Sequence, residues 1–184
     1  MQVPSDQDLI EQCRDPKQRA AAFGLIVKRY QERVYYMVRR MVIDHDDAND
    51  VVQDAFIKAY KALPKFRGDS QLYTWLYRIA SNIAIDHLNK KKRFLRAPEE
   101  LEERLAATID NGPHYSGNEI QNKLEKAVLT LPDKQRLVFQ LKYYEELKYQ
   151  NISEITGTSV GALKASYHIA VKKIVQIIKA DQTF

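Results

Sequence analysis

Residues 66–88 read FRGDSQLYTWLYRIASNIAIDHL, and this stretch predicts a long amphipathic helix. From Leu72 to Ala84 its apolar side chains recur every three or four residues, which is the helical period. The stretches 23–41 and 48–63 carry apolar stripes of the same period. Because each stripe has to be covered, the helices predict a small bundle.

The ends of these helices also have sequence signals. The oxygen of Asp44 or Asp46 could cap the helix over 48–63, and that of Asp69 or Ser70 the helix after it. The pair Leu63-Pro64 predicts the end of the helix over 48–63, because a residue before proline disfavours helical backbone.

The rest of the chain also reads as helix. One short helix is expected around Asp6–Cys13, and four more over residues 120–129, 132–144, 149–156 and 160–179. Glycine and proline contribute six residues each to the 184, about half their usual share, which disfavours a sandwich or barrel. We therefore expect an all-α protein of two small helical domains.

Charge divides the chain into three parts. Residues 1–93 carry +5, residues 94–118 carry −3 and residues 119–184 carry +3. The middle part holds two loop signals, Asn111-Gly112-Pro113 and Ser116-Gly117-Asn118. We expect it to be a flexible linker, with a short helix over Pro98–Ile109, and we expect weak contacts between the domains.

Several classes of protein do not fit the sequence. No apolar run reaches the roughly 20 residues of a membrane span, and the N-terminus lacks a secretory signal. Cys13 is the single cysteine, so a reducing cytoplasm is expected. Asp44-His45-Asp46 does not start a calcium loop, because Asn49 and Ala55 stand where glycine and glutamate are needed.

Catalytic motifs are missing from the sequence as well. It contains no P-loop, GxSxG or HExxH pattern, and its four histidines are scattered. We expect no enzymatic activity, cofactor, metal or small-molecule substrate. The net charge of +5 permits a polyanionic partner.

Residues 147–174, LKYQNISEITGTSVGALKASYHIAVKKI, fit a helix-turn-helix centred on Gly157. Its core would comprise Ile152, Ile155, Val160, Leu163, Tyr167 and Ile174. The outward face of the second helix, suited to a major groove, would carry Lys164, Ala165, Ser166, His168 and Lys172. The alternative is a helical hairpin with a solvated lysine face.

Aromatic and basic residues interleave along 66–93, as single-stranded nucleic acid requires. Trp75 lies on the apolar stripe and favours a core role over base stacking. The cluster Lys90–Arg93 could equally serve the dipole at the end of its helix. On the helix before it, Asp47, Asp50 and Asp54 share an outward side, either as ordinary polar surface or as a docking face.

Taken together, these motifs resemble the extracytoplasmic-function sigma factors of bacterial RNA polymerase, from about Phe23 to Lys173. Residues 47–63 are similar to the family's region 2.2, and residues 64–93 to regions 2.3–2.4. Residues 131–164 are similar to regions 4.1–4.2. The resemblance implies a region 2 domain over 1–93, a linker over 94–118 and a region 4 domain over 119–184.

The resemblance also implies roles for individual residues. Docking on the clamp of core RNA polymerase falls to Asp47, Asp50, Gln53, Asp54 and Phe56. Melting and holding of the −10 promoter element falls to Phe66, Arg67, Gly68, Asp69, Ser70, Tyr73, Arg78, Asn82, Lys90, Lys91, Lys92 and Arg93. Reading of the duplex −35 element falls to Ser159, Lys164, Ala165, Ser166, His168 and Lys172.

The second domain departs from the family pattern. Family members often carry arginine where this chain has Ser166, Ile169 and Val171, so its −35 sequence does not carry over. An anti-sigma partner, often membrane-anchored in this family, is a further expectation. The competing functions are a stand-alone helix-turn-helix regulator, which would not need the acidic face or the FRGDS loop, and a nucleic-acid hydrolase.

Overall fold

The computed structural model describes residues 4–94, 103, 105–107 and 119–180, where turns and loops join helices and no strand occurs. The first domain contains α1 (Asp6–Gln12), α2 (Arg19–Val42), α3 (His45–Ala62), a 3-10 turn η1 (Leu63–Lys65) and α4 (Leu72–Phe94). The second domain contains α6 (Glu119–Leu129), α7 (Asp133–Tyr143), α8 (Tyr149–Thr156) and α9 (Val160–Ala180). The predicted all-α class is confirmed, and none of these helices is long and apolar enough to cross a membrane.

The first domain is built on mutual packing of α2, α3 and α4. The predicted apolar stripes supply its core, with Ile26, Met37, Ala59 and Leu76 almost fully buried. Of the two residues predicted to cap α3, the structure selects Asp44. Its side chain accepts hydrogen bonds from the backbone N–H groups of Asp46 and Asp47. By contrast, α4 begins at Leu72, so the residue before it is Gln71 and neither Asp69 nor Ser70.

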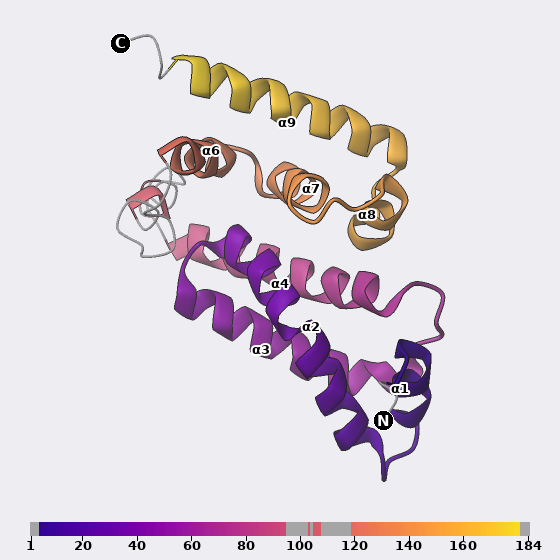
Figure 1. The fold of residues 1–184 in the computed structure, drawn as a ribbon. Coiled ribbons are helices and arrows are strands. Elements are labelled where there is room, and N and C mark those ends of the chain that lie inside the picture. Colours follow the sequence, from indigo (N-terminus) through magenta and orange to yellow (C-terminus); the bar gives the residue numbers. More distant parts are fainter. Residues whose placement is uncertain (1–3, 95–102, 104, 108–118, 181–184) are drawn as a thin grey trace.

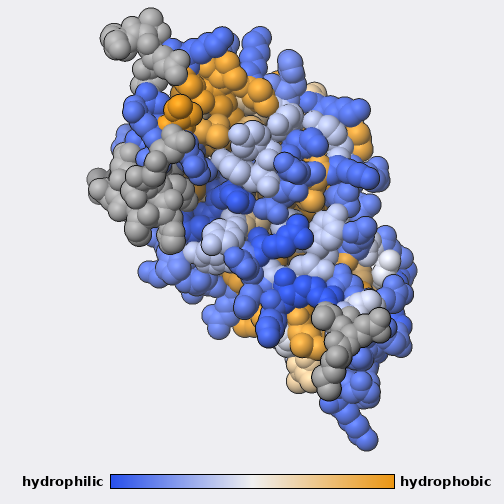
Figure 2. All heavy atoms as spheres, in the orientation of Figure 1, coloured by the Kyte–Doolittle hydropathy of each residue, from blue (hydrophilic) through white to orange (hydrophobic). Residues whose placement is uncertain are grey.

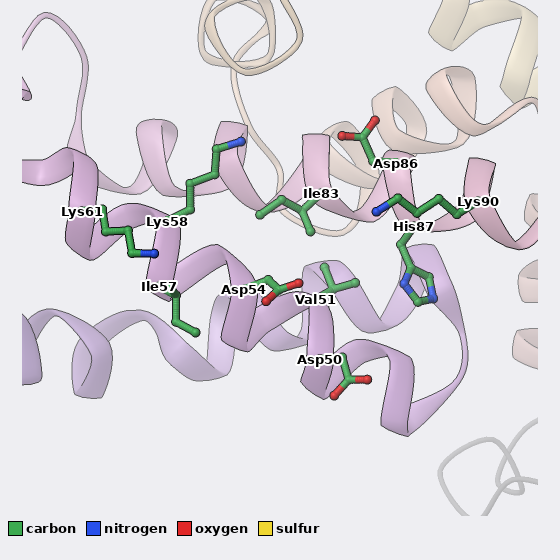
Figure 3. Close-up of a pocket in the computed structure, with 10 residues that line it drawn as sticks. All are labelled: Asp50, Val51, Asp54, Ile57, Lys58, Lys61, Ile83, Asp86, His87 and Lys90. Atoms are coloured by element: carbon green, nitrogen blue, oxygen red, sulfur yellow. The ribbon is translucent and has the colours of Figure 1, made fainter.

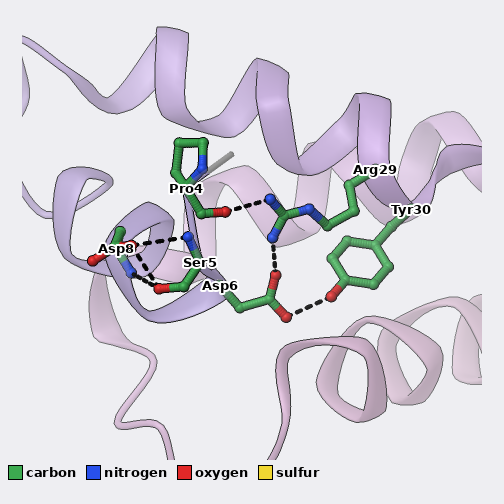
Figure 4. A network of polar contacts seen from close by, with 6 residues as sticks. All are labelled: Pro4, Ser5, Asp6, Asp8, Arg29 and Tyr30. Carbon is green, nitrogen blue, oxygen red and sulfur yellow. Dashed lines mark hydrogen bonds and ion pairs between the residues drawn. The ribbon is translucent and has the colours of Figure 1, made fainter. Parts of the chain in front are cut away.

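The short helix α1 is attached firmly to α2 (Figure 4). Ser5 and Asp8 form a capping box at its start, which satisfies two backbone N–H groups. The carboxylate of Asp6 accepts from the Arg29 guanidinium and from the Tyr30 hydroxyl on α2. Burial and the neighbouring Asp6 raise the pKa of Tyr30 to about 12, so this hydroxyl keeps its proton.

The second domain matches the predicted helix-turn-helix. Gly157 ends α8 with φ +70°, a left-handed conformation that glycine adopts at little cost. Ile152, Ile155 and Leu163 are buried as predicted, whereas Tyr167 is only partly buried. Helices α7 and α8 lie between α9 and the first domain, which places α9 on the outside of the molecule (Figure 1).

The two domains share one core, so the expectation of weak contacts between them is wrong. Leu137, Leu141 and Ile152 of the second domain belong to the same buried apolar cluster as Leu76 and Tyr77 of α4. The physical reason is that α7 and α8 carry apolar stripes on the side turned away from α9, and α2 and α4 cover them.

The expected linker lies largely outside the described residues, and so does most of the helix expected over 98–109. Of that stretch, residues 103 and 105–107 are helical, and Leu105 is buried in the shared core. Most of the surface seen in Figure 2 is hydrophilic, and its largest apolar area lies over the end of α9 and the start of α6. Val175 and Ile120 are among the exposed apolar residues of these helices.

Candidate functional site

The exposed ridge of α3 separates two grooves. A polar groove of about 370 Å³ runs between α3 and α4, where Asp50, Asp54 and Asp86 lie among lysines (Figure 3). An apolar groove of about 410 Å³ runs between α2 and α3, where its lining includes Phe23, Val27, Phe56 and Tyr60. The ridge therefore presents carboxylates directly beside an apolar surface.

The predicted acidic face does not hold together as one surface. Asp50, Gln53 and Asp54 are exposed, as expected for a docking face. Asp47 instead turns toward α4, where its carboxylate pairs with the Lys91 ammonium and its side chain keeps 17% of its exposure. Phe56 is buried to 9% exposure and contributes its ring to the wall of the apolar groove.

The loop before α4 combines an exposed turn with a buried aromatic anchor. Arg67, Gly68 and Asp69 are exposed and Ser70 is partly buried. Phe66 is 8% exposed and packs on Trp75, with their ring centroids 5.0 Å apart. As placed here, Phe66 supports the loop and offers little face for a base.

The candidate −10 residues on α4 fall into exposed and engaged groups. Arg78, Asn82, Lys90 and Arg93 are exposed. Tyr73 is partly buried, and its hydroxyl oxygen accepts a 2.8 Å hydrogen bond from Asn151 of the second domain. Two lysines of the basic cluster are ion-paired, Lys91 with Asp47 and Lys92 with Asp133 at 2.7 Å.

The outward face of α9 is open along its length. Ser159, Lys164, Ala165, His168 and Lys172 are all exposed. The remaining member of the predicted set, Ser166, is partly buried, and its carbonyl oxygen accepts from the Gln135 side chain at 3.4 Å. A helix with one face free over this span can enter a major groove.

A polar network at the domain interface was not predicted from the sequence. Its centre is Glu145, which follows α7 and accepts from Arg40 at 2.9 Å and from Tyr77 at 2.7 Å. Gln140 donates to the backbone carbonyl of Arg40 at 2.6 Å. The one signal that could have pointed to this network is Gln140 itself, a polar residue between the apolar Phe139 and Leu141 of α7.

Buried ionisable groups continue this network inside the second domain. The Tyr144 hydroxyl donates to Glu125 at 2.9 Å, and the Arg40 guanidinium lies 4.6 Å from the centre of the Tyr144 ring. Burial raises the pKa of Glu125 and that of Tyr144. Within the described residues, no group of three or more histidine, cysteine or acidic side chains is placed to hold a metal ion.

Comparisons with known proteins agree with this two-domain organisation. The family model for sigma-70 region 2 matches residues 26–94, and that for sigma-70 region 4 matches residues 121–174. The RNA polymerase sigma-H factor of Pseudomonas aeruginosa is 36% identical over 171 residues, covering 87% of this chain and 86% of that protein. The ECF RNA polymerase sigma-E factor of Escherichia coli K12 is 36% identical over 172 residues, covering 88% and 87%.

Two solved structures are similar over most of the chain. CnrH, in complex with the cytosolic domain of CnrY, aligns with a TM-score of 0.69 and 26% identity, covering 96% of this chain and 98% of that one. RpoE of Bartonella quintana, in complex with the anti-sigma factor NepR, aligns with a TM-score of 0.66 and 20% identity, covering 86% and 98%. The second of these supports the fold alone.

Proposed function

This chain belongs to the extracytoplasmic-function sigma factors of RNA polymerase, and from that premise we propose how its surfaces divide the work of promoter recognition. The protein is an alternative sigma factor for promoter-specific initiation of transcription. We propose that residues 1–93 bind core polymerase and the −10 element, and that residues 119–184 bind the −35 element. The segment 94–118 would connect them.

Docking on core polymerase is assigned to the α3 ridge. Asp50, Gln53 and Asp54 are exposed, and the apolar groove begins beside Gln53. A carboxylate ridge beside an apolar groove suits a basic partner surface that also buries apolar side chains. This juxtaposition is the observation that carries the proposal.

Capture of the melted −10 strand is assigned to the exposed turn before α4 and to α4 itself. Arg67, Arg78 and Asn82 are exposed there and supply cationic and amide groups for phosphates and a base. Unstacking a base costs a few kcal/mol, which phosphate pairing and stacking in the holoenzyme can offset.

Reading of the −35 duplex is assigned to α9. Lys164 and Lys172 can pair with phosphates, while Ala165 and His168 lie between them on the exposed face and can approach base edges. Ser166, Ile169 and Val171 of α9 are uncharged, and we expect this protein to read a −35 sequence of its own.

The remaining assignments follow the family. We propose that the protein has no catalysis of its own, works in the bacterial cytoplasm and binds an anti-sigma factor. Support for the protein partner comes from the solved relative CnrH, which is bound to the cytosolic domain of CnrY.

The test is capture of core RNA polymerase by tagged protein. We expect wild type to retain polymerase and Asp54→Lys to lose most of it, with its unfolding unchanged. Glu32→Lys, an exposed site on α2, gives the same change of charge and should bind as wild type does. Failure of folded wild type to retain polymerase, together with sequence-specific duplex binding on its own, would support the stand-alone regulator.

A further inference from the structure

The domain interface includes two of the proposed −10 residues. Asn151 of α8 donates to the Tyr73 hydroxyl, and Asp133 of α7 pairs with Lys92. Both Tyr73 and Lys92 are residues assigned above to the −10 element. Their polar groups are therefore engaged by the second domain.

The exposed turn before α4 also lies near the second domain. A polar cavity of about 540 Å³ is lined by residues 67–72, by α1 and by two residues of α8, Asn151 and Glu154. Glu154 places a carboxylate in the lining that contains Arg67, so the second domain adds negative charge where a phosphate would have to bind.

The opposite side of the second domain is unaffected. Lys164, His168 and Lys172 remain exposed while the domains are docked, although the Lys164 ammonium lies 6.0 Å from the centre of the Tyr149 ring on α8. Figure 1 shows α9 as the outermost layer, beyond α6, α7 and α8. In the docked arrangement, the proposed −35 surface is therefore accessible, whereas part of the proposed −10 surface is engaged by the second domain.

The polar contacts between the domains are suited to a reversible interface. Glu145 is held by Arg40 and Tyr77, with Arg33 at 4.0 Å, and Gln140 is held by the Arg40 carbonyl. Each of these polar groups can exchange its partner for water when the domains part, which lowers the cost of separation compared with an all-apolar interface.

We propose that the free chain is partly self-masked: the second domain docks on α2 and α4, engages Tyr73 and Lys92 and places Glu154 near Arg67, while it leaves the −35 face of α9 open. Arg78 and Asn82 stay exposed in the docked state, and separation of the domains must precede use of Tyr73 and Lys92 by the −10 strand. This inference rests on the proposed function for the identity of the two DNA surfaces, whereas the docking itself does not.

Two variants weaken the docking without touching the proposed DNA-binding residues. Glu145→Lys places a cation against Arg40 and Arg33. Its matched control is Glu146→Lys, since the neighbouring Glu146 is exposed. Tyr77→Phe removes one hydroxyl that donates to Glu145, keeps the buried ring and changes no charge.

The domain separation can be measured by pulsed electron paramagnetic resonance on the full chain. Spin labels are attached at Gln31→Cys on α2 and Gln176→Cys on α9, both exposed, while the native Cys13 is fully buried. We expect one narrow distance for wild type and Glu146→Lys, and a longer, broader distribution for Glu145→Lys and Tyr77→Phe. A broad distribution in wild type would overturn the proposal.

Masking is tested by measuring the affinity of each protein variant for two fluorescent DNAs of random sequence. One is a 30-nucleotide single strand and the other is a 30-base-pair duplex. A site that is open for part of the time loses apparent affinity in proportion, so we expect Tyr77→Phe to bind the single strand about three- to tenfold more tightly than wild type. Glu145→Lys should show the same gain over Glu146→Lys. Duplex binding should be equal within each pair.

The outcomes separate this inference from the proposed function. A longer distance without a gain in single-strand affinity would overturn the masking, because opening would then uncover nothing. If wild type and Glu145→Lys both fail to retain core polymerase, the proposed function is wrong, while the distance measurement still reports whether the domains dock.

Discussion

Asp47 Oδ1 lies 3.3 Å from Nε2 of His87, so a residue expected on an outward face instead joins α3 to α4. Lys91 pairs with the other oxygen of the same carboxylate. Both partners come from the last turns of α4, next to the basic cluster. Asp47 therefore orders the end of α4.

Removing the charge of Asp47 should lower the stability of the folded protein. We expect Asp47→Asn to lower the free energy of unfolding by about 1 kcal/mol, as for a partly buried ion pair. Asp50→Asn, one turn further along α3 and exposed, should leave it unchanged. Urea unfolding of the two variants checks this, and equal stabilities would contradict the role given to Asp47.

Phe66 should behave as a core residue. Its ring packs on Trp75, so we expect Phe66→Ala to cost about 3 kcal/mol of stability and Phe66→Leu clearly less. Thermal or urea unfolding measures the difference. A Phe66→Ala protein as stable as wild type would show that the ring is free to stack on a base.

Two glycines of the helix-turn-helix should respond in opposite ways to alanine. Gly157 has φ +70°, so Gly157→Ala should cost about 1 kcal/mol. Gly161 lies within α9 with nothing within 4 Å of an added Cβ, so Gly161→Ala should stabilise by up to about 1 kcal/mol. Chemical unfolding of both variants provides the test, and a shift of the same sign in both would count against this account of the turn.

Glu125 should make the protein less stable as pH rises. Burial raises its pKa in the folded state above the ordinary value of 4.5. The folded state then holds this proton more tightly than the unfolded one, so its contribution is full below about pH 4.5 and is lost as pH rises through the raised pKa.

We accordingly expect Glu125→Gln to match wild type in stability near pH 4 and to exceed it at pH 7 by about 1 kcal/mol. Unfolding curves at several pH values measure this, with Glu119→Gln, whose side chain is 84% exposed, as the control. A pH-independent difference between Glu125→Gln and wild type would contradict the assignment.

Local signals in the sequence were enough to predict the helices and not the way they pack. The helix at Tyr149–Thr156 and the start of α9 at Val160 were predicted to the residue, because the apolar period and Gly157 act within a few positions. The direction taken by Asp47 depends on His87, forty residues away, and the site of Glu145 depends on Arg40 and Tyr77. Periodicity indicates that a face is covered, without indicating which helix covers it.

The same limit applies to the candidate DNA surfaces. Exposure of Lys164, His168 and Lys172 followed from the outward positions of one helix. The engagement of Tyr73 by Asn151 could not be predicted, since the two residues are 78 positions apart and no local pattern relates them. The roles assigned to these residues in promoter recognition stay predictions.

The apolar cluster that crosses the domain interface sets a requirement on whatever opens the chain. Leu137, Leu141 and Ile152 share that cluster with Leu76 and Tyr77. Separating the domains would therefore expose two apolar surfaces to water, which is unfavourable. A partner that separated the domains through charged contacts alone would leave those apolar faces exposed, and the protein would then be prone to aggregate. The partner therefore has to bring an apolar surface of its own. Until it binds, each domain keeps the apolar face of the other domain away from water.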